Sequence, residues 1–400
     1  MNDAPLFDWL ETAARFSLPG PGVSRFFLTE EHRQLIVYLR SLMVECGLRT
    51  HLDDAGNLVG RKISNGSDNV LYIGSHQDTV PNGGRFDGML GILLALSAVY
   101  ELRDINLPFN VEVVAFGDEE GTRFNSTLLG SKALSGIFDE SALSARDEQG
   151  MSIAEALHDF GLNPEKIPSI ARDQKNALGY IEAHIEQGPV LENQNLPVGV
   201  VSSITGIERH AVSIKGQAGH AGTVPMHLRK DALVAASFYV QWVDTYCKET
   251  EDMTGVVGKI EIRPNSVNVI PESANITIEL RSPYKDVRLR ARKALSMLTS
   301  RLVDAGFAVN SELIYGQEGL ICDDVLVQKL EAAIQKENIP PVKIYSGAGH
   351  DALAMAALCP VAMLFVRCKD GLSHHHEESV DINDAIAAKR VLKRFIRDFI

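Results

Sequence analysis

Three short runs of apolar residues, each flanked by polar loops, predict buried strands in this chain. They are 70–75 (VLYIGS), 111–117 (VEVVAFG) and 361–366 (VAMLFV). Between the first two, 89–102 has a long helical pattern, which completes a β-α-β unit. The third run follows a helical pattern at 351–358. We therefore predict a layered α/β fold with a central mixed sheet and helices on both faces.

The stretch from residue 206 to 320 has a different order of patterns. Strand-like segments and helical patterns alternate there as β-α-β-β-α-β, at 209–215, 229–248, 258–263, 274–281, 287–305 and 308–314. That order is typical of the ferredoxin-like α+β arrangement. We predict a first domain of residues 1–206 and 321–400, with a second domain of residues 207–320 inserted into it.

Length and charge narrow the classes of function. The chain has 400 residues, more than one hydrophobic core usually supports, which agrees with two domains. The net charge of −13 and the lack of a basic stripe argue against nucleic acid as a partner. Every apolar run falls short of the ~18 residues of a membrane span, so no membrane partner is expected.

Cysteine usage and the N-terminal residues predict a cytoplasmic protein. The five cysteines are odd in number, widely spread and without a C-x-x-C pair, as is typical of reduced thiols. The first residues lack the basic and apolar regions of a signal peptide. Leu6, Leu10 and Ala13 recur there at helical spacing instead.

His76 and Asp78 directly follow the first predicted strand, in the pattern G-S-H-x-D. Ligands of open α/β sheets gather beyond the carboxyl ends of the strands. Asp78 is placed to accept the second ring N–H of His76 and so fix its tautomer. A loop histidine beside a turn aspartate is the alternative interpretation.

Asp87 lies between Gly84 and Gly88, immediately before the predicted helix. A carboxylate can bridge two cations, and the glycines permit close approach of the backbone. A helix N-cap is the alternative, and for Asp87 taken alone it is the favoured one.

Glu119 and Glu120 directly follow the second predicted strand. Adjacent carboxylates repel one another, and a cation relieves that repulsion. One glutamate can then ligate while the other remains free to take a proton from a water. A solvated acidic turn is the alternative.

His184 and His374 complete the set of candidate ligands. His184 lies in an alternating apolar segment, where a histidine is more often a core residue than a ligand. The triplet at 374–376 could be an exposed run without a role, but Glu378, four residues after His374, favours His374. The joint occurrence of these segments at the ends of successive α/β units predicts a two-metal hydrolytic site.

Motifs along nearly the whole chain resemble the M20 group of metal-dependent hydrolases, and most closely its hydantoinase/carbamoylase branch of amidohydrolases. They are GSHQDTVPNGGRFDG (74–88), GDEEGTRF (117–124), LGSKALSG (129–136), EAHIEQGPVLE (182–192), GHAGTVPMHLRKDAL (219–233), NVIP (268–271), ELRS (279–282) and SGAGHDA (346–352). The order of the motifs is that of the family.

The resemblance implies two divalent cations, Zn²⁺ or Mn²⁺. His76, Asp87 and His184 would hold one cation, and Asp87, Glu120 and His374 the other, with Asp87 as the bridge. Glu119 would be the general base. Many peptidases of the group have an acidic residue where this chain has His184, so the histidine favours carbamoyl or ureido substrates over peptides.

The resemblance also implies the substrate contacts and the partner. His220 would stabilise the oxyanion, typically in the site of a partner subunit, with residues 207–320 serving as lid and dimerisation domain. Gln187, Asn268 and Arg281 would bind polar groups of the substrate, and Arg281 suits a carboxylate. The loop ending at Gly349 could offer backbone N–H groups. Asn268 as a turn residue and Arg281 as a surface residue remain alternatives.

The expected activity is hydrolysis of a C–N bond in a carbamoyl or ureido group on a carboxylate-bearing small molecule, such as allantoate or an N-carbamoyl-L-amino acid, with release of ammonia. Two other interpretations stay open: an aminoacylase or peptidase, and a non-catalytic metal-binding protein. His375 and His376 stand where relatives often have smaller residues or proline, which leaves the choice of ligand within the triplet open.

Overall fold

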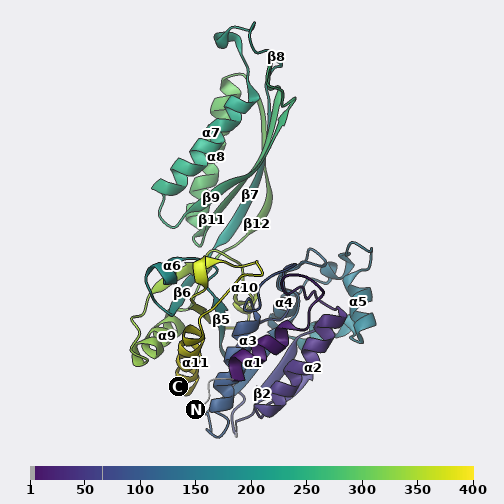
Figure 1. Ribbon diagram of the computed structural model, residues 1–400, viewed down its shortest axis with the longest axis vertical. Helices are drawn as coiled ribbons and strands as arrows, with labels where there is room; N and C mark the ends of the chain where they lie inside the picture. The colour runs from purple at the N-terminus through teal and green to yellow at the C-terminus, as the bar shows by residue number, and fades with distance from the viewer. Residues whose placement is uncertain (1–4, 65) are drawn as a thin grey trace. The chain divides into compact units, whose positions relative to one another are not determined.

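The structure of the protein is a computed structural model that describes residues 5–64 and 66–400 (Figure 1). The chain divides into two compact units. Unit 1 comprises Met1–Ser202 and Cys322–Ile400, and unit 2 comprises Ser203–Ile321. The predicted insertion at 207–320 falls within unit 2.

The larger sheet has nine strands and is mixed. Its order is β1-β2-β4-β3-β5-β15-β6-β13, and β14 also pairs with β6. Strand β3 pairs in parallel with β4 and β5, and β5 pairs in parallel with β15. The strands are β1 (Arg49–Leu52), β2 (Leu58–Lys62), β3 (Val70–His76), β4 (Asn110–Phe116), β5 (Ala177–Ile185), β6 (Val198–Ile204), β13 (Leu320–Ile321), β14 (Lys343–Ser346) and β15 (Val361–Val366).

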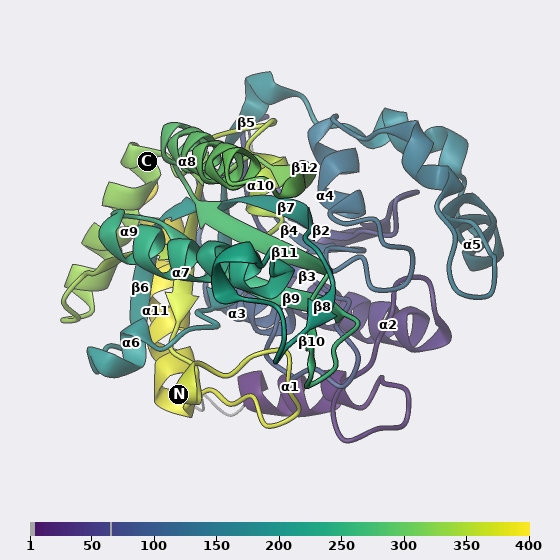
Figure 2. The same cartoon turned by 90° about the horizontal axis from the view of Figure 1, so that it is seen from above.

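Helices cover both faces of this sheet. Figures 1 and 2 show α1, α2 and α3 on one face and α4 and α10 on the other. The α-helices of unit 1 are α1 (Pro5–Ala14), α2 (Glu30–Glu45), α3 (Met89–Glu101), α4 (Leu129–Ser135), α5 (Ile153–Phe160), α6 (Val190–Asn193), α9 (Asp324–Lys336), α10 (Ala352–Met355) and α11 (Ile382–Arg397).

Burial explains why the central strands are continuous apolar runs. Every residue of β3, β4 and β15 is buried, as expected for strands with helices on both sides. Helix α3 is likewise buried along most of its length, because it packs against β3, β5 and α11. The predicted α/β fold with a central mixed sheet is confirmed. The helical pattern at 351–358 is longer than the helix itself, since α10 ends at Met355.

Unit 2 is built around a four-stranded antiparallel sheet with the order β12-β7-β11-β9. Helices α7 and α8 pack on it, and Ile276, Ile278 and Leu280 of β11 belong to their shared core. The elements are β7 (Gly206–Lys215), α7 (Ala232–Glu249), β9 (Thr254–Arg263), β11 (Ser273–Ser282), α8 (Lys285–Asp304) and β12 (Ala308–Gln317). A separate short pair joins β8 (Gly219–His220) to β10 (Val269–Ile270).

A buried ion-pair cluster lies on β7. Glu208 accepts two hydrogen bonds from Arg292, at 2.9 Å from Nε and 2.7 Å from Nη2, and its Oε2 lies 3.2 Å from His210 Nε2. Burial opposes ionisation of Glu208, but the bonds from His210 and Arg292 outweigh it and lower its pKa to about 2. The carboxylate is therefore charged in the folded state, and its partners stabilise that charge.

Within residues 5–64 and 66–400, none of the helices is both long enough and apolar enough to cross a bilayer.

Candidate metal centre

The candidate ligands lie where parallel strands end at one edge of the larger sheet. His76 is the last residue of β3, and His184 is the penultimate residue of β5. Glu119 and Glu120 follow the end of β4 by a short loop. Because β4, β3 and β5 are parallel neighbours, their carboxyl ends place these side chains together.

The first group of candidate ligands contains His76, Asp87 and His184, all buried. Asp87 Oδ1 lies 3.0 Å from His184 Nε2 and 3.4 Å from His76 Nε2. The two Nε2 atoms are 3.3 Å apart. Three ligand atoms from three separate elements therefore converge on one point.

The tautomers of the two histidines explain why this point suits a cation. His76 Nδ1 lies 3.0 Å from the backbone oxygen of Asp78, and His184 Nδ1 lies 3.0 Å from that of Ile185. A carbonyl oxygen only accepts, so each Nδ1 carries the proton and each Nε2 presents a lone pair. The two lone pairs and a carboxylate oxygen without a hydrogen-bond donor then face one another. A divalent cation satisfies all three, so this donor set fits a metal.

Asp87 also connects this group to a second one. Its other oxygen, Oδ2, lies 3.3 Å from His374 Nε2, which is 3.6 Å from Glu120 Oε1. The alternative role of Asp87 as a helix N-cap is excluded, because the cap residue of α3 is Gly88. Gly88 has φ 63°, and a Cβ there would lie 2.5 Å from the His76 ring, so this position requires glycine.

Among the three consecutive histidines, His374 is the one that the structure brings to Asp87. The rings of His375 and His376 lie 4.2 Å apart, centroid to centroid, and form a separate group with Glu377. His374 has a φ of 56°, in the left-handed region.

Asp78 has a different role from the predicted one. Its carboxylate lies 3.9 Å from His76 Nδ1, too far for a hydrogen bond, and it is the backbone oxygen of Asp78 that holds the ring. The carboxylate instead accepts the backbone N–H groups of Glu119 and Glu120, both at 3.1 Å. The prediction that the Asp78 side chain fixes His76 is therefore wrong, and the side chain holds the acidic loop.

Glu119 and Glu120 both lie beside His76. Burial is the main cause that raises the pKa of Glu119 well above its ordinary value, and the Glu120 and Asp351 carboxylates add to it against the opposing effect of His76. Burial also raises the pKa of Glu120, to about 7. Two carboxyl groups are thus held beside His76 in surroundings that disfavour their charged forms, and a bound cation would favour those forms, which again fits a site for metal ions.

Gln187 lies at the same centre. Its Nε2 donates to Asp87 Oδ2 at 3.2 Å and to Ser373 Oγ at 3.1 Å. The loop that contains Gly349 adjoins it, since the ring of His350 lies 4.5 Å from that of His184, centroid to centroid.

The other predicted substrate contacts lie in unit 2. His220 on β8 is paired in register with Val269, so it lies across from the residue after Asn268. Arg281 donates from Nε and Nη2 to Glu279 Oε1, at 2.8 and 2.6 Å, within β11.

Two supporting residues had little weight in the sequence analysis. Glu378 Oε1 accepts the backbone N–H groups of Phe86 and Asp87, each at 3.0 Å, and its Oε2 accepts from Ser373 at 3.0 Å. Glu182 accepts from Ser75 Oγ at 3.1 Å and from the backbone N–H of Ala352 at 3.0 Å. Glu182 stands two residues before His184 on the same face of a strand, and that spacing is a signal that could have identified it.

Comparison with known proteins agrees with this geometry. The model of the peptidase family M20/M25/M40 matches residues 72–398. The chain belongs to this family. The predicted resemblance to the M20 group is thereby confirmed.

Relatives within the M20 family lie in the branch that the motifs indicated. An N-carbamoyl-L-amino acid amidohydrolase of Geobacillus stearothermophilus is 37% identical over 94% of this chain and 92% of its own length. An allantoate deiminase of Arabidopsis thaliana is also 37% identical, over 94% and 78%. The crystal structure of a hydantoinase/carbamoylase family amidase from Burkholderia multivorans has a TM-score of 0.93 and 31% identity, covering 99% of this chain and 97% of that one.

Proposed function

We propose that this protein hydrolyses a C–N bond in a carbamoyl or ureido group on a carboxylate-bearing small molecule, with release of ammonia. The observation that carries the proposal is Asp87, whose two carboxylate oxygens face two separate groups of nitrogen and oxygen ligands. The names of the relatives supply the substrate class: three bacterial relatives are N-carbamoyl-L-amino acid amidohydrolases, and a plant relative is an allantoate deiminase.

His76, Asp87 and His184 would hold one divalent cation, and Asp87, Glu120 and His374 would hold a second, as Zn²⁺ or Mn²⁺. Bound there, the cations would polarise the carbonyl group and make a water nucleophilic near neutral pH. The mixed nitrogen and oxygen donors suit both metals.

Glu119 is the residue we assign as general base. It belongs to neither of the two ligand sets that share Asp87, and its backbone is fixed by Asp78. Its carboxylate would take a proton from the attacking water and return it to the leaving nitrogen. The buried surroundings raise the pKa of Glu119 and so favour both transfers, because they bring the proton affinity of its carboxylate closer to that of the water and of the leaving nitrogen.

Further polar groups would hold the substrate. Gln187 would contribute an amide, and the loop ending at Gly349 would contribute backbone N–H groups. Asn268 and Arg281 would bind the carboxylate end, and His220 would stabilise the oxyanion in a partner subunit.

We also propose that the protein is a homodimer formed through residues 207–320. Helix α7 exposes Leu233, Val234 and Phe238 at 41%, 52% and 48%, which is unusual for consecutive turns of a helix surrounded by water. Residues 207–320 would also serve as a lid that excludes water from the site when it closes. Light scattering that shows an active monomer would refute the role of His220 in a partner's site.

A cytoplasmic location is part of the same proposal. All five cysteines are free thiols, and Cys46, Cys322, Cys359 and Cys368 are buried, which suits a reducing compartment.

The test is a Glu119→Gln variant assayed with allantoate, an N-carbamoyl-L-amino acid, 3-ureidopropionate and a dipeptide. We expect the wild type to release ammonia from one of the first three in the presence of Mn²⁺ or Zn²⁺. We expect Glu119→Gln to bind as much metal as the wild type but to lose turnover. Dipeptide cleavage alone would favour a peptidase, and metal binding without any turnover would favour a non-catalytic protein.

A further inference from the structure

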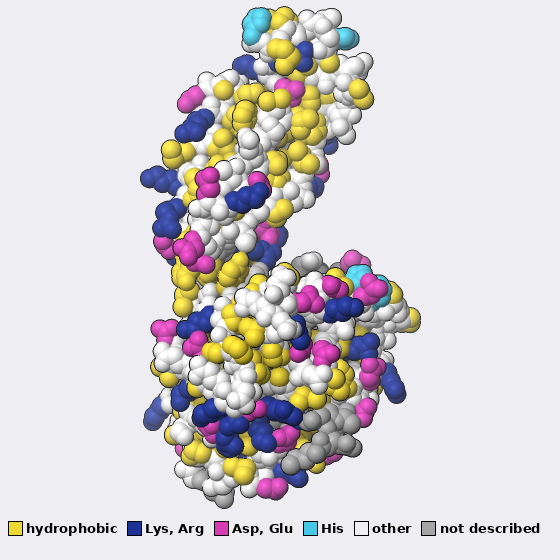
Figure 3. All heavy atoms as spheres, turned by 60° about the vertical axis from the view of Figure 1, so that its left-hand side comes forward, with side chains coloured by type: hydrophobic (Ala, Val, Ile, Leu, Met, Phe, Trp, Pro, Cys, Tyr) yellow, Lys and Arg dark blue, Asp and Glu magenta, His cyan; other side chains and the backbone are white. Residues whose placement is uncertain are grey.

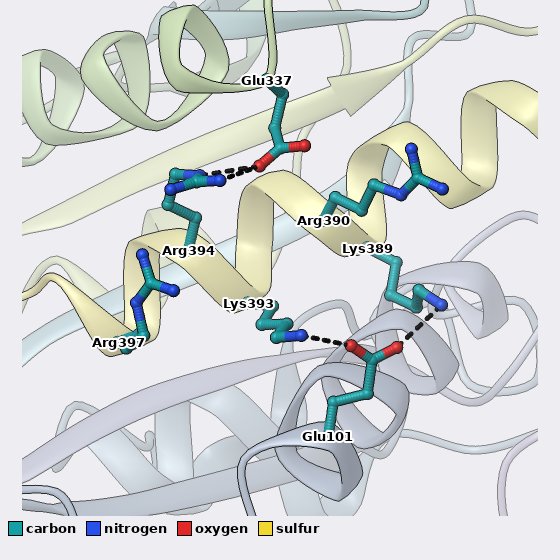
Figure 4. Close-up of a pocket in the computed structure, with 7 residues that line it drawn as sticks. All are labelled: Glu101, Glu337, Lys389, Arg390, Lys393, Arg394 and Arg397. Atoms are coloured by element: carbon teal, nitrogen blue, oxygen red, sulfur yellow. Dashed lines mark hydrogen bonds and ion pairs between the residues drawn. The ribbon is translucent and has the colours of Figure 1, made fainter. Parts of the chain in front are cut away.

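Helix α11 lines a cavity that is separate from the metal centre. The cavity has a volume of about 380 Å³, and seven charged side chains surround it, none of them a candidate metal ligand (Figure 4). They are Lys389, Arg390, Lys393, Arg394 and Arg397 of α11, with Glu101 at the end of α3 and Glu337 at the end of α9. We call it the α11 cavity.

The two carboxylates of the α11 cavity are already engaged. Glu101 lies between two lysines, 2.9 Å from Lys389 Nζ and 2.6 Å from Lys393 Nζ. Glu337 Oε1 accepts from Arg394 Nε at 2.7 Å and lies 2.6 Å from its Nη2. Lys389 is itself only 6% exposed, so a buried cation is held in the wall of the cavity.

Positive charge remains in excess after these pairs are formed. Five cations face two carboxylates in the lining, which leaves three positive charges on a chain whose net charge is −13. Arg390 makes no ion pair with the other side chains drawn in Figure 4. Arg397 pairs with Asp398, which lies outside the lining. Figure 3 shows Lys and Arg side chains gathered on one face of unit 1.

The helix dipole explains only part of this arrangement. Cations are favoured in the last turn of a helix, and Arg394 and Arg397 lie in the last turn of α11. The effect falls off within that turn, so it does not account for Lys389, Arg390 or Lys393. Their excess charge instead indicates a place where an anion is held.

Spacing along the helix places three arginines on one side of α11. Arg390, Arg394 and Arg397 stand at positions i, i+4 and i+7, which share one side of a helix. Guanidinium forks match the oxygens of a phosphate group in pairs. Because all seven lining side chains are charged, the lining has no aromatic ring on which a nucleotide base could stack.

We propose that the α11 cavity binds a small anion with two adjacent phosphate groups, either inorganic pyrophosphate or the diphosphate of a nucleotide. Recognition rests on the phosphate groups and not on a base. The proposal does not depend on the hydrolytic activity, since the cavity and the metal centre have no residue in common.

The test is calorimetric titration of the full-length, metal-containing protein at constant ionic strength with sodium pyrophosphate, ADP or inorganic phosphate. The variant is Arg390→Ala with Arg397→Ala. Its matched control is Arg15→Ala with Arg40→Ala, which removes the same charge from two other exposed arginines. Both double variants leave the metal centre unchanged, so pyrophosphate bound to the metals would appear equally in each.

We expect saturable binding of one pyrophosphate per chain, weakened at least about tenfold in the Arg390/Arg397 variant and unchanged in the control. ADP should bind about as tightly as pyrophosphate, and inorganic phosphate more weakly. Equal weakening in both double variants, no effect of the Arg390/Arg397 change, or no saturable binding would overturn the proposal. ADP binding about tenfold tighter than pyrophosphate would overturn recognition by phosphate alone.

Discussion

Replacing Asp78 by asparagine separates two accounts of how the candidate base is held. The Asp78 carboxylate accepts one backbone N–H bond from Glu119 and one from Glu120, each at 3.1 Å. Asparagine has the same shape but a single oxygen, and its NH₂ group would face the second N–H, so that donor meets donor. The substitution therefore removes at least one bond without opening a cavity.

The size of the effect follows from that single bond. A hydrogen bond to a charged group contributes about 1.5–3 kcal/mol. If this hydrogen bond stabilises the position of Glu119 in the transition state, loss of the bond lowers kcat by about 10- to 150-fold. His76 should remain in position, because its Nδ1 bonds to the backbone oxygen of Asp78 at 3.0 Å, which the substitution leaves intact. We therefore expect a large loss of kcat with unchanged metal content.

The assay combines ammonia release with elemental analysis of bound metal. Asp231→Asn is the control, because the Asp231 carboxylate also accepts two backbone N–H bonds, from Leu233 and Val234, and is outside the candidate ligand set. It should leave kcat unchanged. Loss of metal in Asp78→Asn would support the rejected account, in which the side chain fixes a ligand. An unchanged kcat would refute the positioning of Glu119 by Asp78.

Three further predictions test the ligands and the fold. His374→Ala should lose about half of the bound metal and most of the activity, as expected for one ligand of a two-metal site. His375→Ala should keep its metal content and its activity. Equal losses in the two variants would contradict the choice of His374 as the ligand. Dialysis against a chelator should abolish ammonia release and Mn²⁺ or Zn²⁺ should restore it, since the proposed reaction needs the cations; activity that persists would exclude metal dependence. Glu208→Gln should destabilise unit 2 by about 3 kcal/mol at pH 7, in urea unfolding followed by Trp242 fluorescence in a Trp9→Phe background. Because folding lowers the pKa of Glu208 from its ordinary value to about 2, its contribution is present above the unfolded pKa and is lost as the pH falls toward the folded one. A difference that stays constant from pH 7 to about pH 3 would show that the charge is not what stabilises unit 2.

Local patterns identified the central buried strands but neither the ends of the elements nor the short strands. The apolar runs of β3, β4 and β15 are identifiable because both faces of a buried parallel strand are covered, so that its residues are apolar without interruption. Helix α10 is shorter than its pattern, because the buried Leu358 lies in the turn after the helix and extends the apolar pattern past Met355. The strand β2 has only five residues, too few for an alternation of apolar and polar residues to be recognised.

The candidate ligands were identifiable for a related reason. Each follows a strand that the sequence identifies, or repeats a motif of the family. The role of the Asp78 side chain was not identifiable, because its donors belong to a loop 41 and 42 residues further along the chain. Glu378 binds the backbone at Phe86 and Asp87 from 292 and 291 residues away, and no local pattern contains that contact.

The contacts that escape local patterns also explain how strained loops are kept in place. Asp118, Gln187 and His374 have φ values of 59°, 57° and 56°, and each adjoins or belongs to the candidate ligand set. A non-glycine residue in this region costs of order 1 kcal/mol or more, so three such residues need compensation from their surroundings. Asp78 supplies part of it at Glu119, next to Asp118, and Glu378 supplies part of it through Ser373, next to His374. Each of the two also binds the backbone of a loop to which it does not belong. It follows that replacing either one should disturb ligands in other segments of the chain, which distinguishes a site assembled from interlocked loops from one in which each loop holds its own ligand.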